Sequence, residues 1–285
     1  MKSLPRDGAK IIEPQPVVEG AGVRLNRSIG TRTLDYLDPF LLLDHFASDN
    51  PSDYAAGFPL HPHRGIETVT YVLTGAVHHK DTLGNSGAIG AGDVQWMTAG
   101  RGIMHEEMPQ VRPEGIAGFQ LWVNLPAKRK MAAPRYQEIR AGEIPEIKKE
   151  HGIRIRAIAG SVDGVNAPVT GIAADPVYLD VFVPAHASLS QPIARGHTAF
   201  AYVFEGNGKF GSADGADDLT VSPRLLVLAD GDFVKVTTAG SAVRFLLVSG
   251  KPLGERIARH GPFVMNTSEE IEQALLDLRR GTFVR

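Results

Sequence analysis

The sequence contains no cysteine among its 285 residues. No disulfide can therefore form, and no thiolate can act as a nucleophile or a metal ligand. Long apolar runs are also absent, both in the opening MKSLPRDGAKIIEPQP, where a signal peptide would lie, and further along, where stretches such as 225–229 have only strand length. We therefore expect a soluble cytoplasmic protein, with a nuclear location left open for a eukaryotic source.

A surplus of one charge sign is missing as well. The 30 basic and 32 acidic residues leave a formal net charge of −2. Binding to nucleic acid or to an anionic membrane by charge alone needs a basic surplus. The short basic cluster at 128–130 is interpreted as a solvated turn. We expect no direct nucleic-acid binding, no membrane attachment and a monomeric chain.

Short strand-forming runs dominate what is present. They are separated by 19 prolines and 31 glycines, and this pattern is typical of an all-β sandwich or barrel. One short helix is expected near the end, where Asn266, Thr267 and Ser268 supply capping residues. The apolar residues that follow recur at near-helical spacing up to Gly281, at Ile271, Leu275, Leu276 and Leu278. The expected strands are 67–73, 94–97, 118–125, 154–159, 177–183, 198–204 and 243–248.

An internal repeat divides the chain. Residues 64–75 read RGIETVTYVLTG and residues 195–206 read RGHTAFAYVFEG, with five positions matching without a gap. Chance similarity of two strands is the alternative, because short β segments resemble one another easily. The repeat predicts two copies of one β-rich unit, and the strand pattern is interrupted between them at 126–150.

Two pairs of polar residues carry the chemistry. His61 with His63, and His105 with Glu107, are each spaced i, i+2, so in extended chain each pair shares one face. Three imidazoles and one carboxylate suit Fe(II), Mn(II), Ni(II), Cu(II) or Zn(II) and disfavour Mg²⁺ or Ca²⁺. Inward-facing histidines can also simply pack and hydrogen-bond, so one pair alone would be weak evidence.

The sequence around these residues resembles the cupin superfamily and, more specifically, the pirin family. The cupin first motif is matched by Gly57, His61, His63, Glu67 and Gly75, and the second by Gly92, Gly100 and His105. The pirin-like segments are DPFLLLDHF (38–46), HPHRGIETVTY (61–71), GDVQWMTAGRGIMHEEMP (92–109), FQLWVNLP (119–126) and GPFVMNT (261–267).

The resemblance implies a bicupin: two double-stranded β-helix (jelly-roll) barrels, with the metal in the first. We expect a metal-binding cupin domain at 1–135 and a degenerate one at 136–285, whose final segment packs back on the first. The implied ligands are His61, His63, His105 and Glu107.

Three positions around this ligand set leave alternatives open. Glu67 is expected to face inward as a partner of the ligands or as an acid/base group, with a role as a metal ligand as the alternative. A bulge in the strand that carries His105 would let Glu106 exchange roles with Glu107. Leu60 stands where pirins often have an aspartate. The second repeat lacks the ligands, with Pro192, Ala194 and Thr198 at the matching positions.

The resemblance also implies an activity. Bacterial pirin-like proteins are associated with quercetin 2,3-dioxygenase activity, so we expect a mononuclear site, most simply Fe(II), that takes a flavonol or similar small aromatic substrate. Glu107, or Glu67, would accept the substrate's hydroxyl proton. The alternative is a non-enzymatic, redox-sensing regulator that binds a transcription factor or a metabolic enzyme.

Overall fold

The computed structural model describes residues 3–211 and 219–284, which form two compact units. The N-terminal unit combines Gln15–Ala141 with the C-terminal segment Leu253–Arg285. The C-terminal unit combines Gly142–Pro252 with the chain up to Pro14. These compact units differ from the expected domains 1–135 and 136–285. The chain up to Pro14 belongs to the C-terminal unit, and the segment from Leu253 onward belongs to the N-terminal unit.

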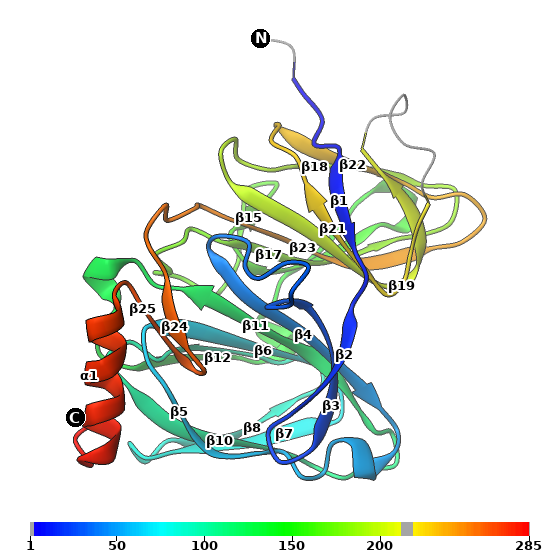
Figure 1. Cartoon of the computed structure of the whole chain (residues 1–285). Helices are drawn as coiled ribbons and strands as arrows, with labels where there is room; N and C mark the ends of the chain where they lie inside the picture. Colours follow the sequence, from blue (N-terminus) through cyan, green and yellow to red (C-terminus); the bar gives the residue numbers. More distant parts are fainter. Residues whose placement is uncertain (1–2, 212–218, 285) are drawn as a thin grey trace. The chain divides into compact units, whose positions relative to one another are not determined.

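Two antiparallel sheets face each other in the N-terminal unit (Figure 1). The larger sheet contains, in spatial order, β12 (Arg135–Ile139), β9 (Val94–Thr98), β6 (Ile66–Thr74), β11 (Ile116–Asn124), β4 (Phe40–Ser48), β3 (Val23–Ile29) and β2 (Gln15–Glu19). The smaller sheet contains β5 (Phe58–His63), β10 (Ile103–Pro109), β7 (Ala76–Asp81) and β8 (Ser86–Gly90).

The C-terminal segment adds a hairpin and a helix to this unit. The hairpin is β24 (Ala258–His260) with β25 (Phe263–Met265), and the helix is α1 (Ser268–Arg279). Thr267 caps α1: its hydroxyl accepts from the Glu270 amide, and the Glu270 carboxylate accepts from the Thr267 amide. The expected capped helix is therefore confirmed.

The C-terminal unit is built around one large antiparallel sheet. Its main path is β1 (Gly8–Ile12), β21 (Arg224–Leu228), β19 (Thr198–Phe210), β23 (Val243–Gly250), β17 (Val177–Val183), β14 (Arg154–Ala159) and β13 (Glu146–Lys148). The flanking strands are β18 (Ser188–Pro192), β20 (Thr220–Val221) and β22 (Phe233–Thr237), with a separate hairpin of β15 (Ser161–Val162) and β16 (Val165–Asn166).

Four short 3-10 helices complete the described elements: η1 (Pro51–Asp53), η2 (Ala127–Arg129), η3 (Ala141–Glu143) and η4 (Glu150–Gly152). Six of the seven expected runs lie within a strand, and the seventh, 118–125, extends one residue past the end of β11, so the all-β class with one short C-terminal helix is confirmed. None of the described helices has the length and apolarity needed to cross a membrane.

Candidate metal centre

Three imidazoles meet between the sheets of the N-terminal unit. His61 and His63 come from β5 and His105 from β10, and His61 lies directly opposite His105 in the antiparallel register. The ring centroids are 4.8 Å apart for His61 and His63, 4.5 Å for His61 and His105, and 5.1 Å for His63 and His105. One ligand nitrogen from each ring lies within 4.8 Å of the other two.

The spacing of these nitrogens suits a shared metal ion. The Nε2 atoms of His61 and His63 are 3.1 Å apart. Two nitrogens that each bind one ion at about 2.1 Å, at roughly a right angle, would lie about 3 Å apart. His61 Nδ1 lies 2.9 Å from the Pro59 carbonyl. Donating there keeps the proton on Nδ1 and leaves the Nε2 lone pair for the cluster.

Burial keeps His63 and His105 in the neutral form that binds metals. Burial is the largest influence on His63, whose pKa lies well below its ordinary value, and the neighbouring His105 and His61 lower it further. Burial likewise lowers the pKa of His105 to about 3. Among the described residues neither ring nitrogen of His105 has a hydrogen-bond partner. Buried polar nitrogens without partners are rare, and a bound cation would satisfy the one that carries the lone pair.

Glu107, rather than Glu106, shares the buried face with His105. A bulge is present at this point, but its extra residue lies in β5, where His61 pairs with His105 and Phe58 pairs with Glu107. β10 pairs with β7 without a shift. Its alternation is therefore intact: His105 and Glu107 are buried and Glu106 is partly exposed.

The Glu107 carboxylate lies outside the imidazole cluster and is held by Thr70. The Thr70 oxygen is 2.9 Å from Glu107 Oε1 and 2.6 Å from Gln120 Oε1. A hydroxyl has one proton to donate, so it cannot serve both acceptors at once. With the Gln120 amide turned so that its nitrogen faces Thr70, the amide donates to Thr70 and Thr70 donates to Glu107.

The expected inward orientation of Glu67 is wrong. Thr70 and Gln120 line the cavity beside the histidines. Glu67 lies three residues before Thr70 on β6, so its side chain is on the opposite face of the sheet. Its carboxylate accepts hydrogen bonds from Thr98 at 2.7 Å and Trp96 at 3.2 Å on the other face of the sheet. Burial raises its pKa. The turn at Arg64 and Gly65 separates β5 from β6, so the alternation does not continue from His63 to Glu67.

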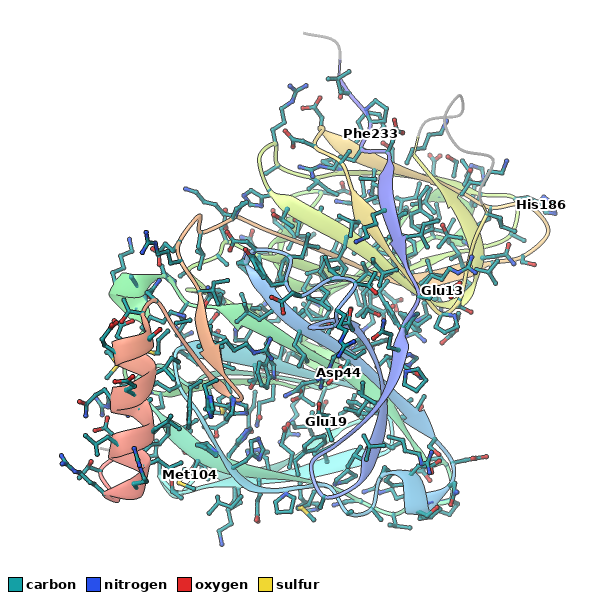
Figure 2. All side chains as sticks on the ribbon, viewed as in Figure 1. Glu13, Glu19, Asp44, Met104, His186 and Phe233 are labelled. Atoms are coloured by element: carbon teal, nitrogen blue, oxygen red, sulfur yellow. The ribbon has the colours of Figure 1, made fainter. Side chains whose placement is uncertain are left out.

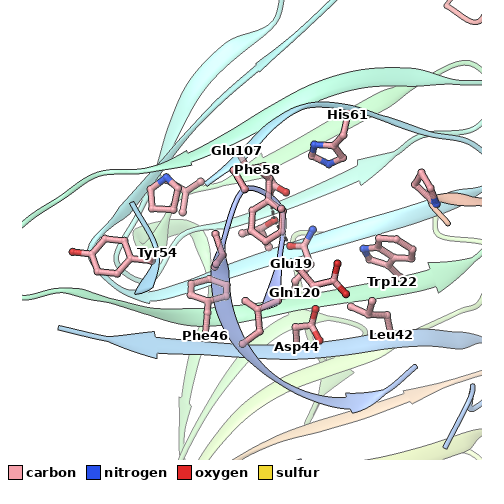
Figure 3. A pocket seen from close by; sticks show the side chains of 18 of the residues that line it. Glu19, Leu42, Asp44, Phe46, Tyr54, Phe58, His61, Glu107, Gln120 and Trp122 are labelled. Carbon is pink, nitrogen blue, oxygen red and sulfur yellow. Dashed lines mark hydrogen bonds between the residues drawn. The ribbon is translucent and has the colours of Figure 1, made fainter. Parts of the chain in front are cut away.

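A cavity of about 610 Å³ opens beside the cluster (Figure 3). His61, His63, Thr70, Glu107 and Gln120 supply polar groups at one part of its wall. The rest of the wall is mainly apolar or aromatic, at Val23, Leu25, Leu42, Phe46, Tyr54, Phe58, Val77, Ile116 and Trp122. It also carries the charged side chains of Glu19, Arg27, Asp44 and Arg259. An apolar cavity of this size with a few converging polar groups is typical of a small-molecule site.

The sequence interpretation missed a second group of polar residues on the far side of His105. His79 on β7 lies opposite Glu107, and its Nε2 is 2.7 Å from Glu138 Oε1. Asp81 lies opposite His105, and Tyr136 stacks on the His79 ring. The i, i+2 spacing of His79 and Asp81 is the signal that could have indicated them.

The second repeat carries no comparable cluster among its described residues. Pro192 ends β18, and Ala194 follows it. Arg195, at the position matching Arg64, forms an exposed ion pair with Asp232. None of these three side chains is a usual metal ligand.

Comparison with known proteins decides the family. Residues 22–123 match the family model Pirin, and residues 178–284 match the model of the Pirin C-terminal cupin domain. A pirin-like protein of Caulobacter vibrioides is 46% identical, over 96% of this chain and 98% of that protein. The chain belongs to the pirin family.

Two further relatives are similar to this chain over most of their length. Homo sapiens Pirin is 45% identical, over 92% of this chain and 88% of that protein. The crystal structure of quercetin 2,3-dioxygenase from Acinetobacter baumannii is 35% identical, with a TM-score of 0.88 and coverage of 98% of both chains. The two-cupin fold expected from the pirin-like segments is thereby confirmed.

Proposed function

We propose that this pirin is a metal-dependent quercetin (flavonol) 2,3-dioxygenase. His61, His63 and His105 would hold one divalent metal ion, with Glu107 as the fourth ligand. Three nitrogen donors and one carboxylate suit Fe(II), although the same set accepts Mn, Ni, Cu or Zn. The observation that carries the proposal is the buried imidazole cluster that opens directly into an apolar cavity.

The cavity walls match a flat aromatic substrate. Trp122 lies edge-on to His63, with ring centroids 5.1 Å apart, and both line the cavity. Phe46 and Phe58 add to the aromatic surface of the cavity, and the Phe58 ring centroid lies 6.3 Å from that of His61 (Figure 3). Aromatic walls favour planar rings by stacking and by removing apolar area from water. The relationship to the Acinetobacter dioxygenase supports the same substrate class.

Glu107 is the group that we assign to proton transfer. A flavonol must lose the proton of its 3-hydroxyl before it can react readily with O₂. The Glu107 carboxylate lines the cavity and is buried, and the Thr70 hydroxyl holds its Oε1 at 2.9 Å. The metal, when bound, supplies the open positions and the Lewis acidity that this chemistry needs. Glu67 is left out of the proton transfer because its carboxylate faces away from the cavity.

The net reaction needs no reductant. One O₂ adds to the flavonol, the central ring opens, and one carbon leaves as carbon monoxide, so atoms and electrons balance without a further partner. The chain's own part is to orient the substrate along the aromatic wall, to accept the hydroxyl proton and to exclude bulk water.

The test is product analysis with purified, metal-loaded protein. We expect quercetin loss, O₂ uptake and carbon monoxide in equal amounts, and no turnover in His105→Ala or metal-depleted protein. Unchanged turnover after metal removal would contradict the proposal. Absence of carbon monoxide and of ring-opened product, together with a protein partner that binds only one oxidation state, would favour the regulator instead.

A further inference from the structure

The C-terminal segment pairs with the chain one residue beyond His63. The Val264 amide donates to the Arg64 carbonyl at 3.0 Å, and the Arg64 amide donates to the Pro262 carbonyl at 3.4 Å. Pro262 also lines the cavity beside His63. The backbone directly after His63 is therefore hydrogen-bonded to a segment about 200 residues away in the sequence.

Arg64 links this segment to both histidine-bearing strands. The side chain is only 3% exposed. Its Nη1 donates to Asp277 Oδ2 on α1 at 2.7 Å, its Nη2 donates to the Phe283 carbonyl at 3.3 Å, and its Nε donates to the Arg101 carbonyl at 2.6 Å. Arg101 lies two residues before β10, the strand of His105. A planar guanidinium is suited to such a fixed three-way contact, which a lysine cannot reproduce.

The neighbour of His105 is packed against the same segment. Met104 contacts the cluster formed by Phe263, Met265, Ile271, Ala274 and Phe283. Met104 lies on the α1 side of the N-terminal unit (Figure 2). Gly102 approaches the Phe283 backbone so closely that a Cβ there would lie 2.8 Å from its carbonyl oxygen. The start of β10 is thus fitted to the C-terminal segment from two sides.

We infer that the C-terminal segment positions His63 and His105 for metal binding, with Arg64 and Asp277 as the positioning residues. Residues that hold metal ligands in place typically change metal affinity about 10- to 100-fold when they are replaced. The inference rests on the metal site of the proposed function, but not on the flavonol reaction. A chain that binds metal and leaves quercetin intact would contradict the activity and leave this inference standing.

The experiment compares Asp277→Asn with Glu272→Gln in the full chain. Both replacements remove one carboxylate from α1, but Glu272 is exposed and its side chain lies outside the Arg64 contacts. Metal-free proteins are titrated with Co(II), and both the dissociation constant and the visible absorption spectrum are recorded. Arg64→Lys is the second variant, because it keeps the positive charge and loses the planar guanidinium that makes the three contacts. Thermal unfolding without metal shows whether each variant is folded.

We expect Asp277→Asn and Arg64→Lys to bind Co(II) at least about tenfold more weakly, with a shifted ligand-field spectrum. Glu272→Gln should match the parent chain in both readouts. A merely structural role would lower the unfolding temperature and leave the spectrum and the affinity of the folded protein unchanged. That result in both variants would overturn the inference.

Discussion

The Thr70 hydroxyl lies 2.9 Å from Glu107 Oε1, across the cavity from one sheet to the other. Thr70 belongs to β6 of the large sheet and Glu107 to β10 of the small one. Gln120, beside Thr70 on the large sheet, completes the chain of contacts at 2.6 Å. The carboxylate that we assign to proton transfer is therefore fixed by the sheet that faces it.

Replacing Thr70 by valine should reduce turnover and leave metal binding largely intact. The variant keeps the shape of the side chain but removes the proton donor to Glu107, whose orientation then becomes less defined. We expect kcat to fall about tenfold, since a correctly placed base contributes about 10²–10⁴ and only part of that is lost. Thr68→Val, one alternation earlier on the same buried face, is the control and should stay near the parent rate.

Glu107→Gln and Glu106→Gln should separate the two neighbouring carboxylates. We expect Glu107→Gln to lower kcat at least about 100-fold, because the amide cannot accept the hydroxyl proton and also replaces the proposed carboxylate ligand of the metal. Glu106 is partly exposed on the other face of β10, so its replacement should leave kcat within about twofold. Equal losses in both variants, measured by steady-state quercetin consumption, would show that the buried face does not define the base.

Local patterns were enough to predict much of the fold and the histidines. Alternation placed His61 beside His63 and His105 beside Glu107, since β5 and β10 are regular over those pairs. The same reasoning failed for Glu67. It assumed one continuous strand, whereas Gly65, with φ +79, turns the chain and resets the alternation. Because of this turn, Glu67 points away from the cavity, although it lies an even number of residues after His61 and His63 in the sequence.

Long-range contacts were beyond what the sequence could indicate. Asp277 reaches Arg64 because a hairpin and a helix return to the first sheet pair, and no local pattern specifies where such a segment docks. His79 was overlooked for a similar reason. His79 lies next to the site because it is opposite Glu107 in the β7–β10 register, and the sequence alone does not show which strands pair.

His45 should make the folded protein less stable in acid. Burial lowers its pKa from 6.5 to about 4 in the folded chain. Between these values the unfolded chain takes up a proton that the folded chain does not, so stability falls as pH falls from 6.5 toward 4. His45→Phe keeps the stacking on Phe119 and removes the titration. We expect its acid-induced loss of unfolding free energy to be smaller by on the order of 1–2 kcal/mol.

The comparison for His45 is between two proteins over one pH range. Burial raises the pKa of Asp44 and of Glu67, so these groups bind protons in the folded state and act in the opposite direction. Urea unfolding of the metal-free parent and variant at several pH values cancels their shared contribution. Parallel stability curves between pH 7 and about 4.5 would contradict the assignment to His45.

Lys130 should contribute strongly to stability despite being a lysine. Its side chain is 1% exposed, and its ammonium donates to the Gly65 carbonyl at 2.9 Å, the Val264 carbonyl at 2.8 Å and the Asn124 side chain. Lys130→Met would remove three hydrogen bonds to buried acceptors, and we expect a loss of about 2–4 kcal/mol in urea unfolding. Lys128→Met, at an exposed position of the same short helix, should change stability by less than about 0.5 kcal/mol.

The metal content of the protein tests the central claim most directly. Protein expressed without a metal-affinity tag should be analysed by elemental mass spectrometry beside His61→Ala, His63→Ala and His105→Ala variants that unfold normally. We predict close to one transition-metal ion per parent chain and a loss of nearly all of it in each variant. A parent chain without metal, or variants that retain the full amount, would contradict the assignment of these three histidines as the metal centre.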